Sequence, residues 1–80
     1  MRLGRFEEGA GFYRRAIRCD PYRASYHWRL ARAEVAAHGP NRAAVDELSL
    51  AVRLNPTNPQ YWQDLVRLVK SVRQPSAGLL

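Results

Sequence analysis

One block of sequence occurs twice in this chain and ends in proline each time. Residues 15–21 read Arg-Ala-Ile-Arg-Cys-Asp-Pro, and residues 50–56 read Leu-Ala-Val-Arg-Leu-Asn-Pro. The two prolines, Pro21 and Pro56, lie 56 − 21 = 35 residues apart. The same offset matches three further pairs: Tyr26 with Tyr61, Leu30 with Leu65, and Arg32 with Arg67. A period of this length indicates a solenoid of helix pairs, in which each pair buries its apolar face on its neighbours.

Prolines divide the chain into four segments. Breaks occur at Asp20-Pro21, Gly39-Pro40 and Asn55-Pro56, because proline disfavours helix at the residue before it and lacks the N–H of an interior helical residue. The segments between the breaks are residues 5–19, 23–38, 41–54 and 59–72. Asn58 followed by Pro59 is typical of a helix start, with asparagine as the N-cap and proline as the first helical residue.

Apolar residues recur in steps of three and four in all four segments, which is the period of an amphipathic helix. No segment alternates as a strand would. We therefore expect an all-α fold, with one domain over residues 1–73 and a flexible tail over residues 74–80. The expected inward-facing residues are Phe6, Gly9, Ala10, Tyr13, Ala16 and Ile17 in the first segment, His27, Leu30, Ala31 and Val35 in the second, Ala44, Val45, Leu48, Ala51 and Val52 in the third, and Trp62, Leu65, Val66 and Val69 in the fourth.

Several of these positions carry a family pattern. A small residue, a large residue four later and a proline eight after that occur as Gly9, Tyr13 and Pro21, and again as Ala44, Leu48 and Pro56. A Trp-x2-Leu-Gly-x2-Tyr pattern is met in part by Trp62, Leu65, Val66 and Val69, and poorly by His27, Leu30, Ala31 and Glu34. With these residues the chain resembles the tetratricopeptide repeat family.

The resemblance implies an antiparallel helix-pair solenoid, wound as a right-handed superhelix, with about four helices. It also implies a frame for the repeats. Residues 3–21 would be the second helix of one repeat, residues 24–56 one full repeat, and residues 59–72 the first helix of the next.

In this family the first helix of each pair lines a concave groove that takes peptides. The resemblance therefore implies a protein–protein interaction module, an adaptor or scaffold, whose groove residues are Ser25, Trp28, Arg29, Arg32, Ala36, Gln60, Gln63, Arg67 and Lys70. An aromatic platform at Trp28 beside Arg32 and Arg67 would suit an acidic or aromatic peptide, through stacking and charge-assisted hydrogen bonds. The alternative is that Trp28 packs locally and the arginine heads are solvated.

The charge balance leaves a second partner class open. The chain has a net charge of +6, and all of its 13 basic residues except Lys70 are arginine. This composition is also found in RNA-binding helical repeats, which use an Arg-rich surface. Because the basic residues are spread over several segments, and Asp20-Pro21 and Asn55-Pro56 fit the peptide-binding family better, we favour a protein or peptide partner over nucleic acid.

No recognised catalytic pattern is present. His27 and His38 do not share a face with Cys19, and Gly-rich phosphate loops, metal-ligand spacings and nucleophile motifs are absent from the sequence. We expect neither an enzyme nor a cofactor. Instead, His27 is expected as a packing residue, and Cys19, which matches Leu54 in the repeat, as a small buried apolar group. No apolar stretch reaches the roughly 18 residues that span a membrane, and no signal peptide is visible, so a cytoplasmic location is expected.

Both ends of the expected helix stack carry unpartnered apolar residues. These are Phe6, Phe12 and Tyr13 on the first segment, and Trp62, Leu65, Leu68 and Val69 on the last. About three repeats are usually needed for a stable solenoid, whereas this sequence holds about two and has no evident polar cap. We therefore expect either self-association through the open ends or a longer repeat array of which this chain is a fragment.

Overall fold

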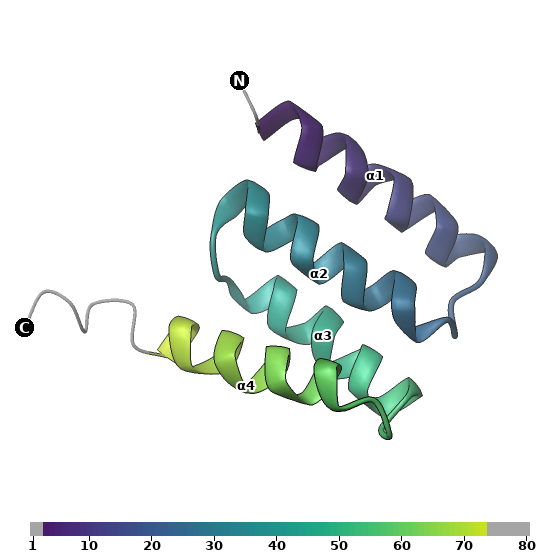
Figure 1. Cartoon of the computed structure of the whole chain (residues 1–80). Coiled ribbons are helices and arrows are strands. Elements are labelled where there is room, and N and C mark those ends of the chain that lie inside the picture. The colour runs from purple at the N-terminus through teal and green to yellow at the C-terminus, as the bar shows by residue number, and fades with distance from the viewer. Residues whose placement is uncertain (1–2, 74–80) are drawn as a thin grey trace, which may run out of the picture.

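The computed structural model describes residues 3–73, which form four α-helices (Figure 1). No strand occurs in this range, so the all-α prediction is confirmed. The tail expected at residues 74–80 lies outside the described residues. The helices are α1 (Leu3–Cys19), α2 (Ala24–His38), α3 (Arg42–Leu54) and α4 (Pro59–Arg73).

Short polar turns begin and end these helices. The side chain of Asn41 accepts a 2.9 Å hydrogen bond from the Ala44 N–H and so caps α3. The side chain of Asn58 accepts a 2.9 Å hydrogen bond from the Gln60 N–H, as its position before Pro59 predicts. Gly39 ends α2 with a φ of 81°, in the left-handed region where only glycine is free of strain.

The turn between α1 and α2 is held by a local ion pair. Asp20 accepts a 2.9 Å hydrogen bond from Nε of Arg23. This hydrogen bond, with the nearby Tyr26 and the charge of Asp20, raises the pKa of the Arg23 guanidinium above its ordinary value. Arg23 occupies the N-cap position of α2 but makes no side-chain cap there.

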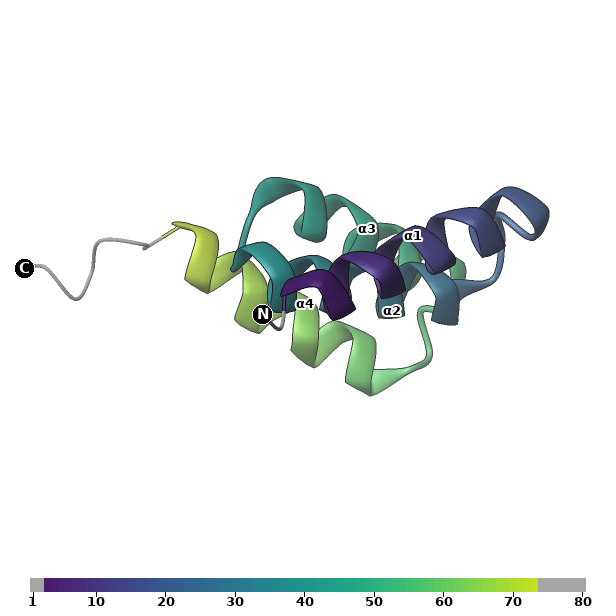
Figure 2. The same cartoon turned by 90° about the horizontal axis from the view of Figure 1, so that it is seen from above.

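Each helix packs on the next one in the chain, and the short turns make every such pair antiparallel (Figure 1). In the view from above, α2 lies between α3 on one side and α4 on the other (Figure 2). The molecule is flat, with extents of 44 × 35 × 16 Å. In this arrangement α2 is the central helix, because it contacts α1 and α3 and also faces α4.

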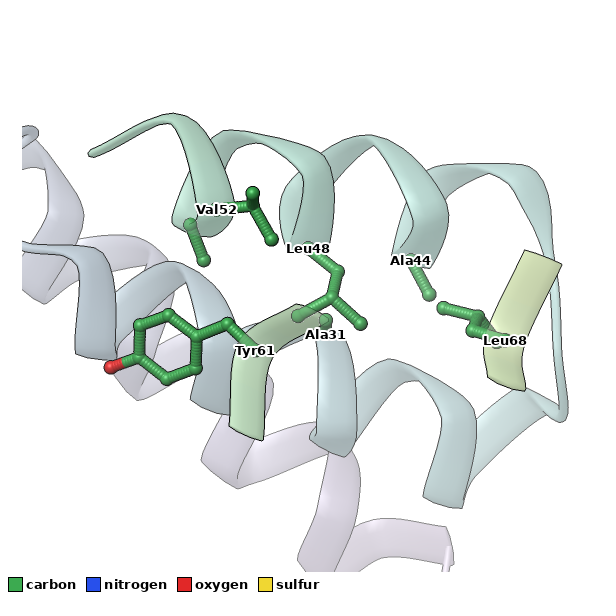
Figure 3. Packing of buried hydrophobic residues seen from close by; sticks show 7 residues of the cluster. Ala31, Ala44, Leu48, Val52, Tyr61 and Leu68 are labelled. Atoms are coloured by element: carbon green, nitrogen blue, oxygen red, sulfur yellow. The ribbon is translucent and has the colours of Figure 1, made fainter. Parts of the chain in front are cut away.

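The core lies where α2, α3 and α4 meet (Figure 3). Three alanines, Ala31, Ala44 and Ala51, are almost fully buried there, and such small residues let helix axes approach closely. Larger side chains fill the space between the helices. The buried cluster comprises Ala31, Ala44, Leu48, Ala51, Val52, Tyr61 and Leu68.

The predicted inward face is confirmed for α3 and only in part for α4. On α3 the expected residues are buried or half-buried, with Ala44 and Leu48 in the core. On α4 the core residues are Tyr61 and Leu68. The expected Leu65 and Val69 are half-buried, with Leu65 packed against the core, whereas the expected Trp62 and Val66 are exposed. Helix α4 carries two adjacent apolar stripes. It turns Tyr61, Leu65 and Leu68 toward α2 and α3 and leaves the stripe of Trp62 and Val66 in solvent.

Two predictions for single residues have opposite outcomes. His27 is buried, as expected of a packing residue. Cys19 is exposed, so the prediction of a buried apolar group is wrong. Its repeat counterpart, Leu54, is itself only half-buried, and Cys19 is the last residue of α1, where none of the described helices covers it.

On α1 the expected inward stripe is only partly covered. Ala10 is buried against the rest of the molecule, whereas Gly9, Tyr13, Ala16 and Ile17 are half-buried. The side chain of Phe6 lies outside what the structure describes. Helix α1 contacts α2 with one side and leaves its other side open to solvent.

Candidate functional site

A groove of about 430 Å³ runs between α2 and α4. Its floor includes three core residues, Ala31, Leu48 and Leu68, and is therefore apolar. Its rim is polar and draws on both helices. The lining residues are Ala31, Arg32, Val35, Ala36, Pro40, Leu48, Gln60, Asp64, Arg67, Leu68 and Ser71.

A tryptophan fixes the two walls of this groove relative to each other. Nε1 of Trp28, on α2, donates a 2.7 Å hydrogen bond to the carboxylate of Asp64, on α4. The Trp28 ring also lies 5.4 Å from the ring of Tyr61, centroid to centroid. Trp28 thus packs against the core and is absent from the groove lining.

Asp64 is the polar centre of the site. One carboxylate oxygen accepts the bond from Trp28, and the other accepts a 3.1 Å hydrogen bond from Nε2 of Gln60. The carboxylate is the only acidic group of α4. Both of its oxygens are engaged by neutral donors within the molecule, so it is oriented rather than free to turn toward a cation.

Two arginines stand at the rim, one on each wall. Arg32, on α2, lies with its guanidinium 4.9 Å from the centroid of the Trp28 ring. Arg67, on α4, is exposed and lines the opposite wall. A cation over an aromatic face is attracted to it, so the Arg32 head is held beside the groove. Together the two arginines outnumber the single carboxylate, and the rim is therefore positive.

The structure brings together some of the residues predicted for the groove and separates others. Arg32, Ala36, Gln60 and Arg67 line it. Ser25, near the start of α2, is half-buried and does not. Arg29 is exposed, and its guanidinium lies 5.8 Å from the Trp28 ring, outside the groove.

Gln63 and Lys70 lie on a different surface. They line a shallow hollow of about 450 Å³ on the outer face of α4, together with Trp62, Val66 and Arg67. The groove stripe of α4 runs through residues 60, 64, 67 and 71, in steps of four and three. Residues one position away point to the neighbouring stripe, which is why Gln63 and Lys70 are separated from Gln60 and Asp64.

Sequence reasoning did not assign seven residues of the lining to the groove: Ala31, Val35, Pro40, Leu48, Asp64, Leu68 and Ser71. For Asp64 and Ser71 a signal exists. Both lie on the helical stripe that starts at the predicted Gln60. Asp64 follows Gln60 by four residues, and Ser71 follows Asp64 by seven.

No protein-family model matches this sequence, and neither curated proteins nor solved structures show a significant match to it. The resemblance to tetratricopeptide repeats therefore rests on the sequence pattern alone. Within residues 3–73, no helix has the length and apolar character needed to cross a membrane. Over the same range, no three His, Cys, Asp or Glu side chains gather where they could hold a metal ion.

Proposed function

We propose that this chain is a protein-interaction module that binds an acidic peptide segment in the groove between α2 and α4. The observation that carries this proposal is the pair Arg32 and Arg67, one on each wall of a groove with an apolar floor. Guanidinium groups form strong, charge-assisted hydrogen bonds with carboxylates. A bound segment would place an apolar side chain over Leu48 and Leu68 and acidic side chains beside the two arginines.

The contact between Trp28 and Asp64 supports this function by holding the groove in one shape. A preformed site loses less conformational entropy on binding than one that must first be ordered. Because Asp64 is already bonded to Trp28 and Gln60, it leaves Arg32 and Arg67 available to a ligand. The module needs no cofactor and performs no reaction in this role.

We further propose that the helices form a solenoid like that of tetratricopeptide repeats, with α2 and α4 as first helices of successive pairs. The internal offset of 35 residues supports this assignment. So does the position of the groove, which is lined by α2 and α4, as expected for first helices. The proposal extends to an adaptor or scaffold role in the cytoplasm.

A titration with a labelled peptide tests the groove. The probe is a fluorescein-labelled 12-residue peptide of alternating leucine and glutamate, followed by fluorescence anisotropy at about 150 mM salt, where the Debye length is about 8 Å. Arg32→Glu combined with Arg67→Glu is expected to weaken binding by at least a hundredfold, since each lost charge-assisted bond costs about 1.5–3 kcal/mol.

The matched control carries the same charge change elsewhere. Arg42→Glu combined with Arg53→Glu alters two exposed arginines of α3 that do not line the groove. This variant is expected to bind within about threefold of the parent, because distant surface charges are screened. Equal weakening by both double variants would show attraction to net charge only and would refute the groove.

The net charge of +6 also favours an alternative function, RNA binding through the Arg-rich surface. In that case a random single-stranded RNA would bind at 150 mM salt, with an affinity that falls steeply as salt increases. Reversing Arg42 and Arg53 would then weaken binding as much as reversing Arg32 and Arg67. Absence of RNA binding at this salt concentration excludes the alternative.

A further inference from the structure

The sequence repeat has a structural counterpart at the starts of α2 and α4. Nε2 of His27 lies 2.7 Å from the carbonyl oxygen of Pro21. Nε1 of Trp62 donates a 3.1 Å hydrogen bond to the carbonyl oxygen of Pro56. Each ring thus reaches the carbonyl of the proline six residues before it, and the two pairs are related by the offset of 35. Helix α4 therefore begins in the same local geometry as α2.

The residues at these equivalent positions of α2 and α4 differ in how much of their surface is exposed. On α2, His27 is 3% exposed and Ala31 is 1% exposed. Their counterparts on α4, Trp62 and Val66, are 49% and 50% exposed. The difference has a simple cause, because α3 packs on this face of α2 and no described helix packs on the same face of α4.

Helix α3 covers α2 with a defined set of residues. Ala44 and Leu48 join Ala31 in the buried cluster, and Oε1 of Glu47 lies 2.8 Å from Nδ1 of His27. Helix α1 is the repeat counterpart of α3, and the offset of 35 relates Ala44, Glu47 and Leu48 to Gly9, Phe12 and Tyr13. Gly9 and Tyr13 are half-buried, and Phe12 is 61% exposed.

We propose that α1 of a second copy packs on the open face of α4, in the register in which α3 packs on α2. The pair Glu47 and His27 is then replaced at the contact between copies by Phe12 and Trp62. Both of these residues are large exposed aromatics in the single chain, and aromatic pairs contribute beyond their buried area. The polar contact within the chain becomes an apolar contact between chains.

Side-chain sizes also match in this register. Within the chain, Ala31 of α2 faces α3, which carries Ala44. At the contact between copies, the counterpart Val66 of α4 faces α1 of the second copy, which carries Gly9. The larger residue on α4 thus meets the smaller one on α1. A Cβ built at Gly9 has no atom within 4 Å in the single chain, so this position has room for a neighbour.

Charge favours the same arrangement. Packed antiparallel, as α2 and α3 are, the start of α1 lies beside the end of α4. The second turn of α1 carries Glu8 and also Glu7, which already contacts His38 within the chain, and the last turn of α4 carries Lys70 and Arg73, all of them exposed. Opposite charges at the rim of an interface speed association and help to fix its register.

The assembly is head-to-tail. Each copy uses α4 at one end and α1 at the other, so the contact is heterologous and leaves a free end at every addition. In this assembly, α2 of the second copy lies next to α4 of the first copy in the same way that α4 lies next to α2 within one chain. A row of equivalent grooves, with arginines at each rim, would run along the assembly.

Sedimentation equilibrium of the 80-residue chain over a range of concentrations tests the proposal. The parent chain has a mass of 9.2 kDa. Its average mass is expected to rise steadily with concentration, without a plateau at two chains. Phe12→Glu blocks the α1 face and Trp62→Glu blocks the α4 face, so each variant alone is expected to stay at one chain. Tyr22→Glu, at an aromatic 79% exposed outside both faces, is the matched control and should associate like the parent.

Mixing the two blocked variants gives the decisive result. Each retains the face that the other lacks, so an equimolar mixture is expected to form a species of two chains and to stop there. An isologous contact would instead leave one variant dimeric on its own, which overturns the proposal. So does a parent chain that stays at one chain up to about 1 mM, where binding is worth only about 4 kcal/mol.

Two further variants keep the test independent of folding and of the groove. Val66→Glu replaces Trp62→Glu if the latter lowers helix content by circular dichroism. Phe12→Glu combined with Trp62→His recreates the pair Glu47 and His27 between copies, and it should regain part of the association that Phe12→Glu loses. Phe12→Glu leaves the groove intact, so it should bind the leucine–glutamate peptide as the parent does, whether or not copies associate.

Discussion

The indole N–H of Trp28 and the carboxylate of Asp64 meet at 2.7 Å, although 36 residues separate them in sequence. This bond connects α2 to α4, two helices that are not consecutive in the chain. It sits beside the groove and sets the distance between the groove walls.

Trp28→Phe is expected to lower the free energy of unfolding by about 1–3 kcal/mol, because it removes a hydrogen bond to a charged group while retaining an aromatic ring. A double-mutant cycle with Asp64→Ala, measured by urea unfolding, should give a coupling of about 1–2 kcal/mol. Gln60→Ala removes the exposed partner of the same carboxylate and should cost about 0.5 kcal/mol or less. A coupling near zero would contradict the bracing role of Trp28.

The buried histidine gives a second prediction. Both ring nitrogens of His27 are engaged, one with the carbonyl of Pro21 and one with Glu47. His27→Leu leaves both partners unsatisfied in a half-buried place, and we expect a loss of about 1–3 kcal/mol in unfolding free energy. His38→Leu makes the same change at an exposed histidine, whose contact with Glu7 lies on the surface, and should cost less than about 1 kcal/mol. Similar losses from the two variants would mean that the contacts of His27 are not stabilising.

The small size of the core makes one leucine decisive. Leu48 lies in the buried cluster between α2, α3 and α4. Leu48→Ala should lower the unfolding free energy by about 2–5 kcal/mol, a large share of the 5–15 kcal/mol typical of domains. Leu50→Ala removes the same atoms from a half-buried residue outside the cluster and should cost about 1 kcal/mol. Thermal and urea unfolding monitored by circular dichroism would compare the two, and a larger loss for Leu50 would place the core elsewhere.

The helices could be predicted from the sequence because their ends are set locally. Pro21, Pro40 and Pro56 mark the turns, and Asn58 caps α4 as its position before Pro59 indicates. The face of α3 was also predictable, since Ala44 and Leu48 belong to its single apolar stripe. Local signals of this kind do not depend on which helix lies next to which.

The face of α4 and the polar centre of the groove could not be predicted in the same way. Helix α4 has two apolar stripes, one through Tyr61 and Leu68 and one through Trp62 and Val66, and only packing against α2 and α3 selects the first. The role of Asp64 depends on its bond to Trp28, which is formed by tertiary contact. No periodicity within a single helix reports such a contact.

Gly39 and Gly11 differ in backbone conformation, so substitution by alanine is expected to lower the stability of the protein at one site and to raise it at the other. Gly39 ends α2 with a φ of 81°, whereas Gly11 lies within α1 and has no such conformation. A Cβ would meet no atom within 4 Å at either site, so steric contact does not distinguish them. Gly39→Ala should destabilise the protein by about 1–2 kcal/mol, because the left-handed conformation is strained for residues with a Cβ. Gly11→Ala should stabilise it by about 0.5–1 kcal/mol, because alanine loses less backbone entropy in a helix. A urea midpoint that rises for Gly39→Ala would show that the α2–α3 turn does not hold Gly39 in this conformation, and a midpoint that falls for Gly11→Ala would contradict the entropy argument for α1.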